Sequence, residues 1–255
     1  MTKERVEWID IAKGIGMIFV MLGHTHCPFL LSKYIFTFHV PLFFFMSGYL
    51  FSAEKYKKLK DFFHKRVNGL LIPYFLFSFL NYFFFLIAHF LFKNNIALAG
   101  VKNIDKYMNI YTPLYGQFLG LYGEKFTIHN EPMWFLLCLF ITEIAFYTIV
   151  KHFSSYKKIG IVLFISAVLG YLYNVYIKIP LPWSADIALT SLVFYGLGYI
   201  TKQKNIFHKA AKIVNLKTLI LFFSLNIIFG MLNTKVDIYH REDGNFFLFY
   251  LAAIT

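Results

Sequence analysis

Charged residues and cysteines are both scarce in this chain of 255 residues. Only 15% of the residues are charged, whereas about a quarter are charged in a typical soluble protein. The two cysteines, Cys27 and Cys138, allow one disulfide at most and build no metal motif, so no metal site is expected. The sequence has no internal repeat and no low-complexity tract, which weakens an interpretation as an inverted-repeat transporter.

Apolar residues make up 58% of the chain, with 33 Phe and 18 Tyr among them. They cluster in runs that approach the roughly 20 residues needed for a membrane-spanning helix. The runs lack the alternation of a membrane barrel, so we predict an all-α, polytopic transmembrane helix bundle. The last run is too short to span, which predicts about eight spans with the last one truncated. The expected apolar segments are 9–29, 35–51, 69–92, 132–150, 159–177, 184–201, 218–233 and 245–255.

The formal net charge of +12 is spread over the segments between these runs. This placement favours contacts with anionic membrane lipids and argues against nucleic acid. With a cytoplasmic N-terminus, the inside segments hold 16 Lys and Arg and the outside segments hold 8. We find no cleavable signal peptide. The sequence therefore predicts one membrane-embedded domain over residues 1–255, with residues 93–131 as an extracytoplasmic loop.

The first span carries ionisable residues, which are costly in a membrane and are functional candidates for that reason. Lys13 and His24 are eleven residues apart and fall on one helix face, about 16 Å apart along the axis. Asp10 stands three residues before Lys13 and can pair with it, although a capping carboxylate and a snorkelling lysine explain the same residues. The imidazole of His24 suits a general base, and a hydrogen-bonded packing role is the alternative.

Further polar residues lie in or beside the later spans, and each has a plain structural alternative. His39 opens the second span, where a following proline can shape a cavity. Ser47 and Gly48 can form a small helix-packing pair. Glu143 can be a protonated packing residue, and Asp186 can cap the sixth span.

Several strings together resemble the membrane acyltransferase type 3 family, and they follow the expected order along most of the chain. The Lys13–His24 spacing with the His-x-Pro-Leu-Phe-Phe string is the most specific part, and its Phe-His-Val-Pro form is closest to sugar O-acetylases. The family usually has about ten spans. The strings are Asp10-Ile-Ala-Lys13-Gly14, Phe38-His39-Val-Pro41-Leu-Phe-Phe-Phe-Met-Ser47-Gly48, Lys65-Arg66 with Leu71-Ile-Pro73-Tyr74, Pro132-Met-Trp134-Phe135-Leu136, and Phe194-Tyr195-Gly196-Leu197-Gly198.

The resemblance implies an enzyme that moves an acetyl group from acetyl-CoA to a hydroxyl of a cell-surface or exported carbohydrate. It implies that a basic loop with Lys65 and Arg66 attracts the CoA phosphates, and that His24 is a base or carries the acyl group. The site expected from it also includes Lys13 and Asp10, with His39, Ser47, Trp134, Glu143 and Asp186 as contacts to the acceptor. The expected location is a bacterial plasma membrane. The alternative is a transporter of a lipid-linked sugar or polysaccharide.

Overall fold

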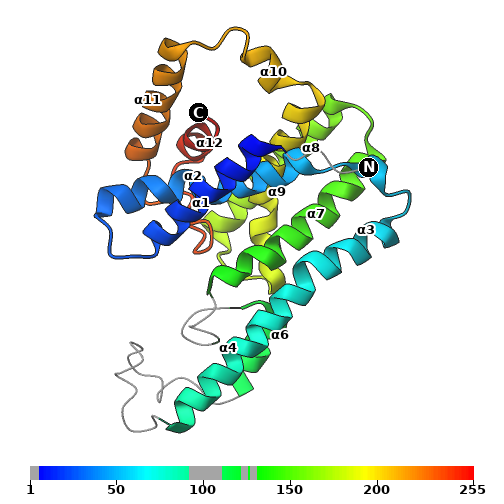
Figure 1. The fold of residues 1–255 in the computed structure, drawn as a ribbon, viewed down its shortest axis with the longest axis vertical. Helices are drawn as coiled ribbons and strands as arrows, with labels where there is room; N and C mark the ends of the chain where they lie inside the picture. Colours follow the sequence, from blue (N-terminus) through cyan, green and yellow to red (C-terminus); the bar gives the residue numbers. More distant parts are fainter. Residues whose placement is uncertain (1–5, 92–110, 122–125, 127–130) are drawn as a thin grey trace. The chain divides into compact units, whose positions relative to one another are not determined.

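The computed structural model describes residues 6–91, 111–121, 126 and 131–255 (Figure 1). Across these residues the regular structure is helical and contains no strand, so the prediction of an all-α fold is confirmed. The predicted outer segment 93–131 lies mostly outside the described residues. The part of it that is described contains helix α6 (Tyr111–Leu119).

Four described segments are long and apolar enough to cross a bilayer, namely Phe29–Leu50, Leu59–Phe84, Trp134–His152 and Tyr156–Tyr176. The prediction of eight spans is therefore not confirmed. The remaining apolar helices include α1 and α11, with 17 residues each, and α12, with nine. The helices are α1 (Glu7–Gly23), α2 (Phe29–Leu50), α3 (Leu59–Arg66), α4 (Ile72–Leu91), α6, α7 (Trp134–His152), α8 (Tyr156–Tyr176), α9 (Ala185–Gln203), α10 (Ile206–Ala210), α11 (Leu216–Leu232) and α12 (Phe246–Ile254).

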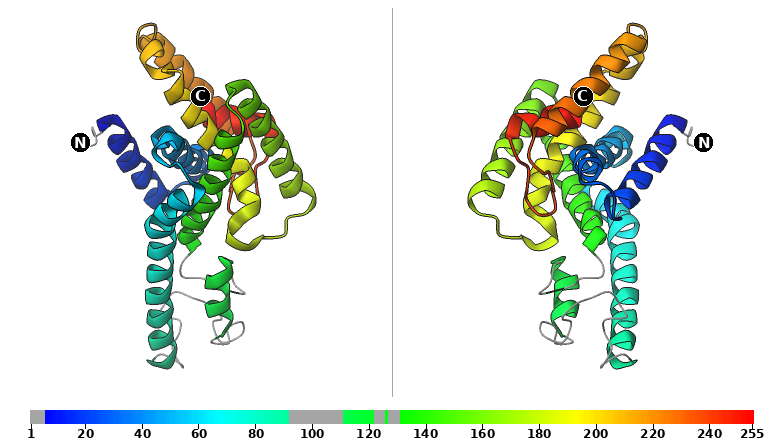
Figure 2. Two further views of the ribbon diagram at one scale, coloured as in Figure 1. Left: turned by 90° about the vertical axis from the view of Figure 1, so that its right-hand side faces the viewer. Right: turned by 90° about the vertical axis from the view of Figure 1, so that its left-hand side faces the viewer.

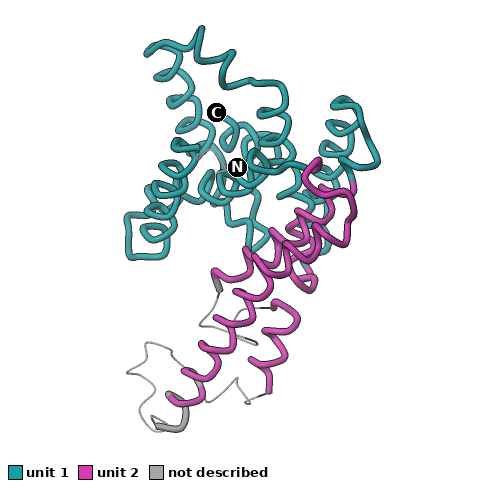
Figure 3. Tube along the Cα trace, turned by 45° about the vertical axis from the view of Figure 1, so that its right-hand side comes forward, with its two compact units in different colours: residues 1–52, 149–178, 189–255 teal, residues 53–148, 179–188 magenta. Residues whose placement is uncertain are grey.

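The chain divides into two compact units, which Figure 3 colours separately. Unit 1 comprises residues 1–52, 149–178 and 189–255, and therefore holds α1, α2, α8, α10, α11, α12, most of α9 and the end of α7. Unit 2 comprises residues 53–148 and 179–188 and holds α3, α4, α6 and most of α7. Each unit is described separately below.

In unit 1, α1 and α2 pack together as a helical hairpin (Figure 2). Two glycines of α1 face aromatic rings of α2: a Cβ at Gly16 would lie 3.0 Å from Phe43, and one at Gly23 would lie 3.1 Å from Phe36. The predicted boundaries were wrong here, because α1 ends at Gly23 rather than at residue 29, and α2 begins at Phe29 rather than at residue 35. The chain reverses in only five residues.

Helices α2 and α9 approach closely through glycines. A Cβ at Gly48 would overlap the carbonyl of Tyr195, and a Cβ at Gly198 would overlap the carbonyl of Phe45. Small residues permit such close approach of helix backbones in membrane proteins. The alternative interpretation of Gly48 as a helix-packing residue is thus confirmed.

Polar side chains connect α2 to α11 and α12. The Tyr34 hydroxyl donates to Asn226 Oδ1 at 2.6 Å, and Asn226 Nδ2 donates to the Ala252 carbonyl at 2.6 Å. Lys33 Nζ donates to the Met231 carbonyl at 2.7 Å. Because hydrocarbon offers no other partners, such bonds fix which helices neighbour one another.

In unit 2, the segment from Leu59 to Leu91 is helical throughout, with a π-helical turn at Val67–Leu71 between α3 and α4. The expectation that Lys65 and Arg66 lie in a loop was therefore wrong, since both residues belong to the last turn of α3. The Tyr74 hydroxyl donates to the Gln117 carbonyl at 2.7 Å and links α4 to α6. The rings of Phe62 and Tyr147 stack at 4.7 Å and link α3 to α7.

Candidate active site

The predicted catalytic residues of α1 are arranged along one helix of unit 1. Asp10 is exposed and Lys13 is half-buried in the first half of α1. His24 is the C-cap residue, where its backbone N–H donates to the carbonyls of Met21 and Val20. His24 therefore lies at the end of the helix, because α1 ends six residues earlier than predicted. The pairing of Asp10 with Lys13 remains a prediction.

His39 was expected to open the second span, and this was wrong. It lies in the middle of α2, is 4% exposed, and Nδ1 is 2.8 Å from the carbonyl of Ile35 one turn earlier. Because a carbonyl can only accept, Nδ1 carries the proton of this hydrogen bond. A neutral imidazole held in this way has its lone pair on Nε2, which is the arrangement that a general base needs.

The rings of the two histidines both approach one aromatic ring, that of Phe36. The centroid of Phe36 is 6.1 Å from the His24 ring and 4.9 Å from the His39 ring. His39 also interacts electrostatically with His24 and with Asp237. Unit 1 thus gathers two imidazoles and a carboxylate from three separate segments of the chain.

Asp237 belongs to the loop between α11 and α12, which sequence analysis did not single out. Asp237 is 8% exposed, and its carboxylate accepts from His240 Nδ1 at 2.9 Å. Burial opposes the ionisation of Asp237, but the hydrogen bonds and charge of His240 outweigh it and hold the pKa of this carboxyl below its ordinary value. Asp237 is therefore a carboxylate at neutral pH.

The hydroxyl of Ser47 makes its hydrogen bond within its own helix. Its hydroxyl donates to the carbonyl of Phe43 in the preceding turn of α2, at 2.8 Å. Such back-bonding satisfies a serine inside an apolar helix. A role for Ser47 in acceptor binding remains a prediction.

In unit 2 the structure joins two predicted residues that sequence analysis assigned to different tasks. Arg66 Nε lies 2.7 Å from Glu143 Oε2, although the Nε–H does not point at this oxygen, so the contact is an ion pair rather than an aligned hydrogen bond. The Glu143 side chain is 4% exposed, and the Arg66 guanidinium also lies 5.0 Å over the Phe62 ring. Glu143 is thus paired with a cation, and the interpretation as a protonated packing residue does not fit this geometry.

Lys65, next to Arg66, is exposed at the end of α3. The same short stretch exposes Lys57, Lys58 and Lys60. Flexible ammonium groups of this kind can bind phosphates as point charges. Lys65 is therefore better placed than the paired Arg66 for a phosphate contact.

The two remaining candidates occupy structural positions in unit 2. Trp134 is the first residue of α7 and is 6% exposed. Asp186 is fully buried near the start of α9, and its Oδ1 accepts from the backbone N–H of Leu181 at 3.1 Å. Asp186 thereby holds the turn before α9, which is close to the capping role considered from sequence. Acceptor contacts by either residue remain predictions.

A second polar cluster of unit 1 also escaped the sequence analysis. Asn174 of α8 donates from Nδ2 to Asp243 Oδ2 at 2.6 Å, and both side chains are buried. Burial raises the pKa of Asp243 to about 6, partly offset by this hydrogen bond. The signals in the sequence were an asparagine inside an apolar run and the dense string Asp237-Ile-Tyr-His240-Arg-Glu-Asp243-Gly244.

Comparison with known proteins identifies the family to which the chain belongs. A family model described as an acyltransferase domain matches residues 6–254, which is nearly the whole chain. Neither the curated proteins nor the solved structures contain a match. The match agrees with the motifs around Lys13, His24 and His39 and with the apolar helices of the fold. The chain therefore belongs to the membrane acyltransferase type 3 family and is a multi-pass membrane acyltransferase.

Proposed function

We propose that the protein transfers an acetyl group from acetyl-CoA to a hydroxyl of a cell-surface or exported carbohydrate. The observation that carries the proposal is the buried imidazole of His39, whose Nδ1–H is bonded to the Ile35 carbonyl so that Nε2 has a free lone pair. An acyltransferase acting on a hydroxyl needs such a base. His24, whose ring also approaches Phe36, supplies a second imidazole.

The transfer takes place in one of two ways with the same atom balance. In direct transfer, an imidazole Nε2 takes the proton of the acceptor hydroxyl while its oxygen attacks the thioester carbonyl carbon. The C–O ester bond forms, the C–S bond breaks, and the CoA thiolate leaves and takes up a proton. In the two-step route, His24 first attacks the thioester carbonyl carbon, the C–S bond breaks, and the CoA thiolate leaves as the acyl-imidazole forms. The acceptor oxygen then attacks the acetyl carbon while a base takes its proton, and the C–N bond to His24 breaks.

The donor would be held from the cytoplasmic side by the basic residues of α3. Lys65 is exposed there with three further lysines close in sequence, and CoA carries phosphates that such groups attract. The proposed topology has the N-terminus in the cytoplasm, as the distribution of Lys and Arg favours. Arg66 would support this segment through Glu143 rather than bind the donor alone.

The test is transfer of radiolabelled acetyl from acetyl-CoA to membrane polysaccharide in vesicles that contain the protein. His39→Asn places an amide N–H where Nδ1–H was, so it retains a donor for the Ile35 carbonyl but removes the Nε2 base. We expect this variant and His24→Gln each to slow transfer by about 10²–10⁴-fold. His26→Gln, which changes an exposed histidine two residues from His24, is the matched control and retains activity.

Unchanged transfer by His39→Asn at equal protein level would remove this base from the mechanism. Labelled protein that accumulates when the acceptor is omitted, and that is absent in His24→Gln, would select the two-step route. If the wild-type protein transfers acetyl from acetyl-CoA to none of the polysaccharides tested, this result would contradict the proposed substrates.

A further inference from the structure

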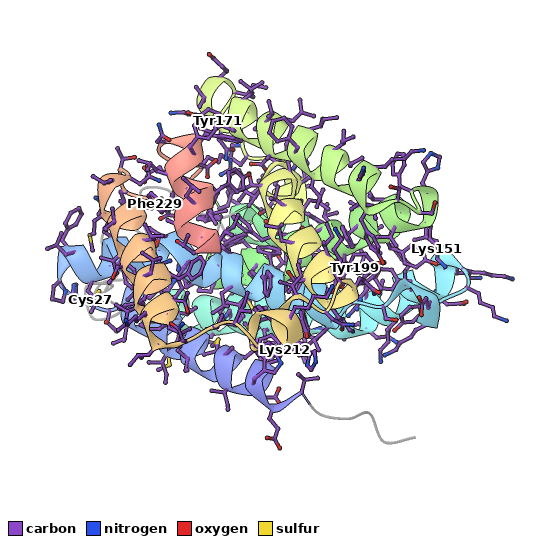
Figure 4. All side chains as sticks on the ribbon, turned by 90° about the horizontal axis from the view of Figure 1, so that it is seen from above. Cys27, Lys151, Tyr171, Tyr199, Lys212 and Phe229 are labelled. Carbon is purple, nitrogen blue, oxygen red and sulfur yellow. The ribbon has the colours of Figure 1, made fainter. Side chains whose placement is uncertain are left out.

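Unit 1 contains a cavity of about 490 Å³ between the C-terminal end of α8 and the loop that joins α11 to α12. Figure 2 shows this loop passing beside α8, and Figure 4 shows Tyr171 on α8 close to α12. The volume is in the range of small-molecule sites. The lining comes from Tyr171, Asn174 and Lys178 of the α8 end and from residues 234–244, chiefly Lys235, Arg241 and Asp243.

The loop is held in a defined shape by its own hydrogen bonds. Asn233 Oδ1 accepts from the backbone N–H groups of Thr234 and Asn245 at 2.9 and 2.8 Å, so one side chain fastens both ends of the loop. Further along, the backbones of Asp237 and Glu242 exchange hydrogen bonds at 2.7 and 3.0 Å. The cavity wall is therefore built by the fold before any ligand arrives, which lowers the entropic cost of binding.

Two acceptor atoms in this wall have no donor among the described residues. Asn174 Nδ2 donates to Asp243 Oδ2, which leaves Oδ1 of each side chain without a hydrogen-bond partner in the described part of the chain. Asn174 is 3% exposed and Asp243 is 5% exposed. A buried polar atom without a partner is costly and is found where a ligand or water completes it.

The chemistry of the cavity wall restricts which ligand can donate hydrogen bonds to these two oxygens. Two neighbouring acceptors require a ligand that donates, and hydroxyl groups do so. The lining carries three cationic side chains, Lys178, Lys235 and Arg241, and two carboxylates, Glu242 and Asp243. Lys235 and Glu242 lie 3.6 Å apart as an ion pair, so charges of both signs surround the cavity and favour an uncharged ligand over a cation or an anion. Tyr171 adds an aromatic ring to the lining, against which an apolar face can pack.

We propose that this cavity binds a sugar unit of the acceptor through hydroxyl groups that donate to Oδ1 of Asp243 and of Asn174. The inference rests on the proposed function and names the acceptor site for it. The same loop supplies Asp237, which interacts electrostatically with His39, so one loop connects the cavity to the candidate base.

An exchange of the two side chains tests the geometry directly. In Asp243→Asn, the oxygen of the new amide keeps the bond from Asn174 Nδ2, so its NH₂ group takes the place of Oδ1 and opposes a hydroxyl donor. In the double exchange Asn174→Asp with Asp243→Asn, the internal bond reverses direction and both positions again present an oxygen. The single variant therefore loses binding and the double variant recovers it.

The measurement is saturation-transfer NMR on the protein in lipid nanodiscs, without acetyl-CoA. The probes are methyl α-L-fucopyranoside, methyl β-D-glucopyranoside and methyl α-D-mannopyranoside. We expect saturation transfer to at least one glycoside with the wild type, about tenfold or more weaker binding with Asp243→Asn, and recovery in the double exchange. Asp61→Asn, an exposed aspartate of α3, is the matched control and leaves binding unchanged.

Equal binding by the wild type and Asp243→Asn would overturn the proposal, as would the absence of saturation transfer with all three glycosides. Loss of binding in Asp243→Asn without recovery in the double exchange would overturn the proposed pair of acceptors. This measurement contains no acetyl-CoA. Binding that follows this pattern would therefore support the cavity as a sugar site even if the acetyl-transfer assay failed. Acetyl transfer with an acceptor KM unaffected by Asp243→Asn would leave the proposed function in place and remove the cavity from it.

Discussion

The buried carboxyl of Asp243 predicts how the stability of the protein depends on pH. Burial raises its pKa from 3.8 to about 6 in the folded state. At about 1.4 kcal/mol per pKa unit, this difference corresponds to about 3 kcal/mol. An Asp with a raised pKa binds its proton more tightly in the folded protein. Its contribution to stability is therefore fully present below pH 3.8 and is lost as the pH rises through about 6.

Replacement of Asp243 by Asn removes this dependence, because the amide keeps the shape and stays neutral at every pH. At pH 8 the variant is expected to be more stable than the wild type by up to about 3 kcal/mol, and at pH 4 the two are expected to be nearly equal. The same substitution is expected to weaken sugar binding about tenfold or more. Residues that serve binding often lower the stability of the folded protein, and Asp243 would be an example.

The assay is unfolding by SDS in mixed micelles, followed by far-UV circular dichroism at several pH values from 4 to 8. Other carboxyls titrate in the same range, so the quantity of interest is the difference between Asp243→Asn and the wild type at each pH. A difference that does not change with pH would refute the argument, and so would a wild type that is more stable at pH 8. Asp61→Asn controls for the loss of one exposed negative charge.

Two further substitutions test contacts that organise the fold. Arg66→Ala removes the partner of the buried Glu143 carboxylate and is expected to lower the free energy of unfolding by about 3–5 kcal/mol. Removing both side chains together should cost less than the sum of the two single changes, and strict additivity in this SDS-unfolding cycle would mean that the pair is not coupled. Gly48→Ala places a Cβ on the Tyr195 carbonyl and is expected to destabilise by about 1–3 kcal/mol. Gly160→Ala, where a Cβ meets nothing within 4 Å, is the control, and equal unfolding of both alanine variants would contradict the close contact of α2 with α9.

The approximate positions of the helices could be predicted from the sequence, because a lipid bilayer requires long apolar segments that satisfy their own backbone hydrogen bonds. The start of α2 was missed because Ser32, Lys33 and Tyr34 look like a polar turn. Lys33 donates to the Met231 carbonyl and Tyr34 to Asn226, so residues almost 200 positions away satisfy them inside a helix. No local pattern contains that information.

The sequence singled out candidate site residues by their type, but it did not show which residues they contact. The histidines at positions 24 and 39 stood out because imidazole is unusual in an apolar run. The Arg66–Glu143 ion pair joins residues 77 positions apart, and the Asn174–Asp243 hydrogen bond joins residues 69 positions apart. Such pairs are set by helix packing, which sequence spacing does not determine without related sequences to compare.

Polar groups inside this protein differ in whether their hydrogen-bonding capacity is satisfied by the fold. Ser47 and Asn226 bond to nearby carbonyls or side chains and stabilise the bundle. His39 uses Nδ1 in this way but has a second nitrogen that no described hydrogen bond uses, and Asn174 and Asp243 each have an oxygen without a described donor. A membrane gives such atoms no water by default, so selection for stability alone would favour apolar replacements. In the proposed function these are the atoms that the acceptor would complete, since its hydroxyl groups would donate to the two oxygens and one hydroxyl would give up its proton to the histidine.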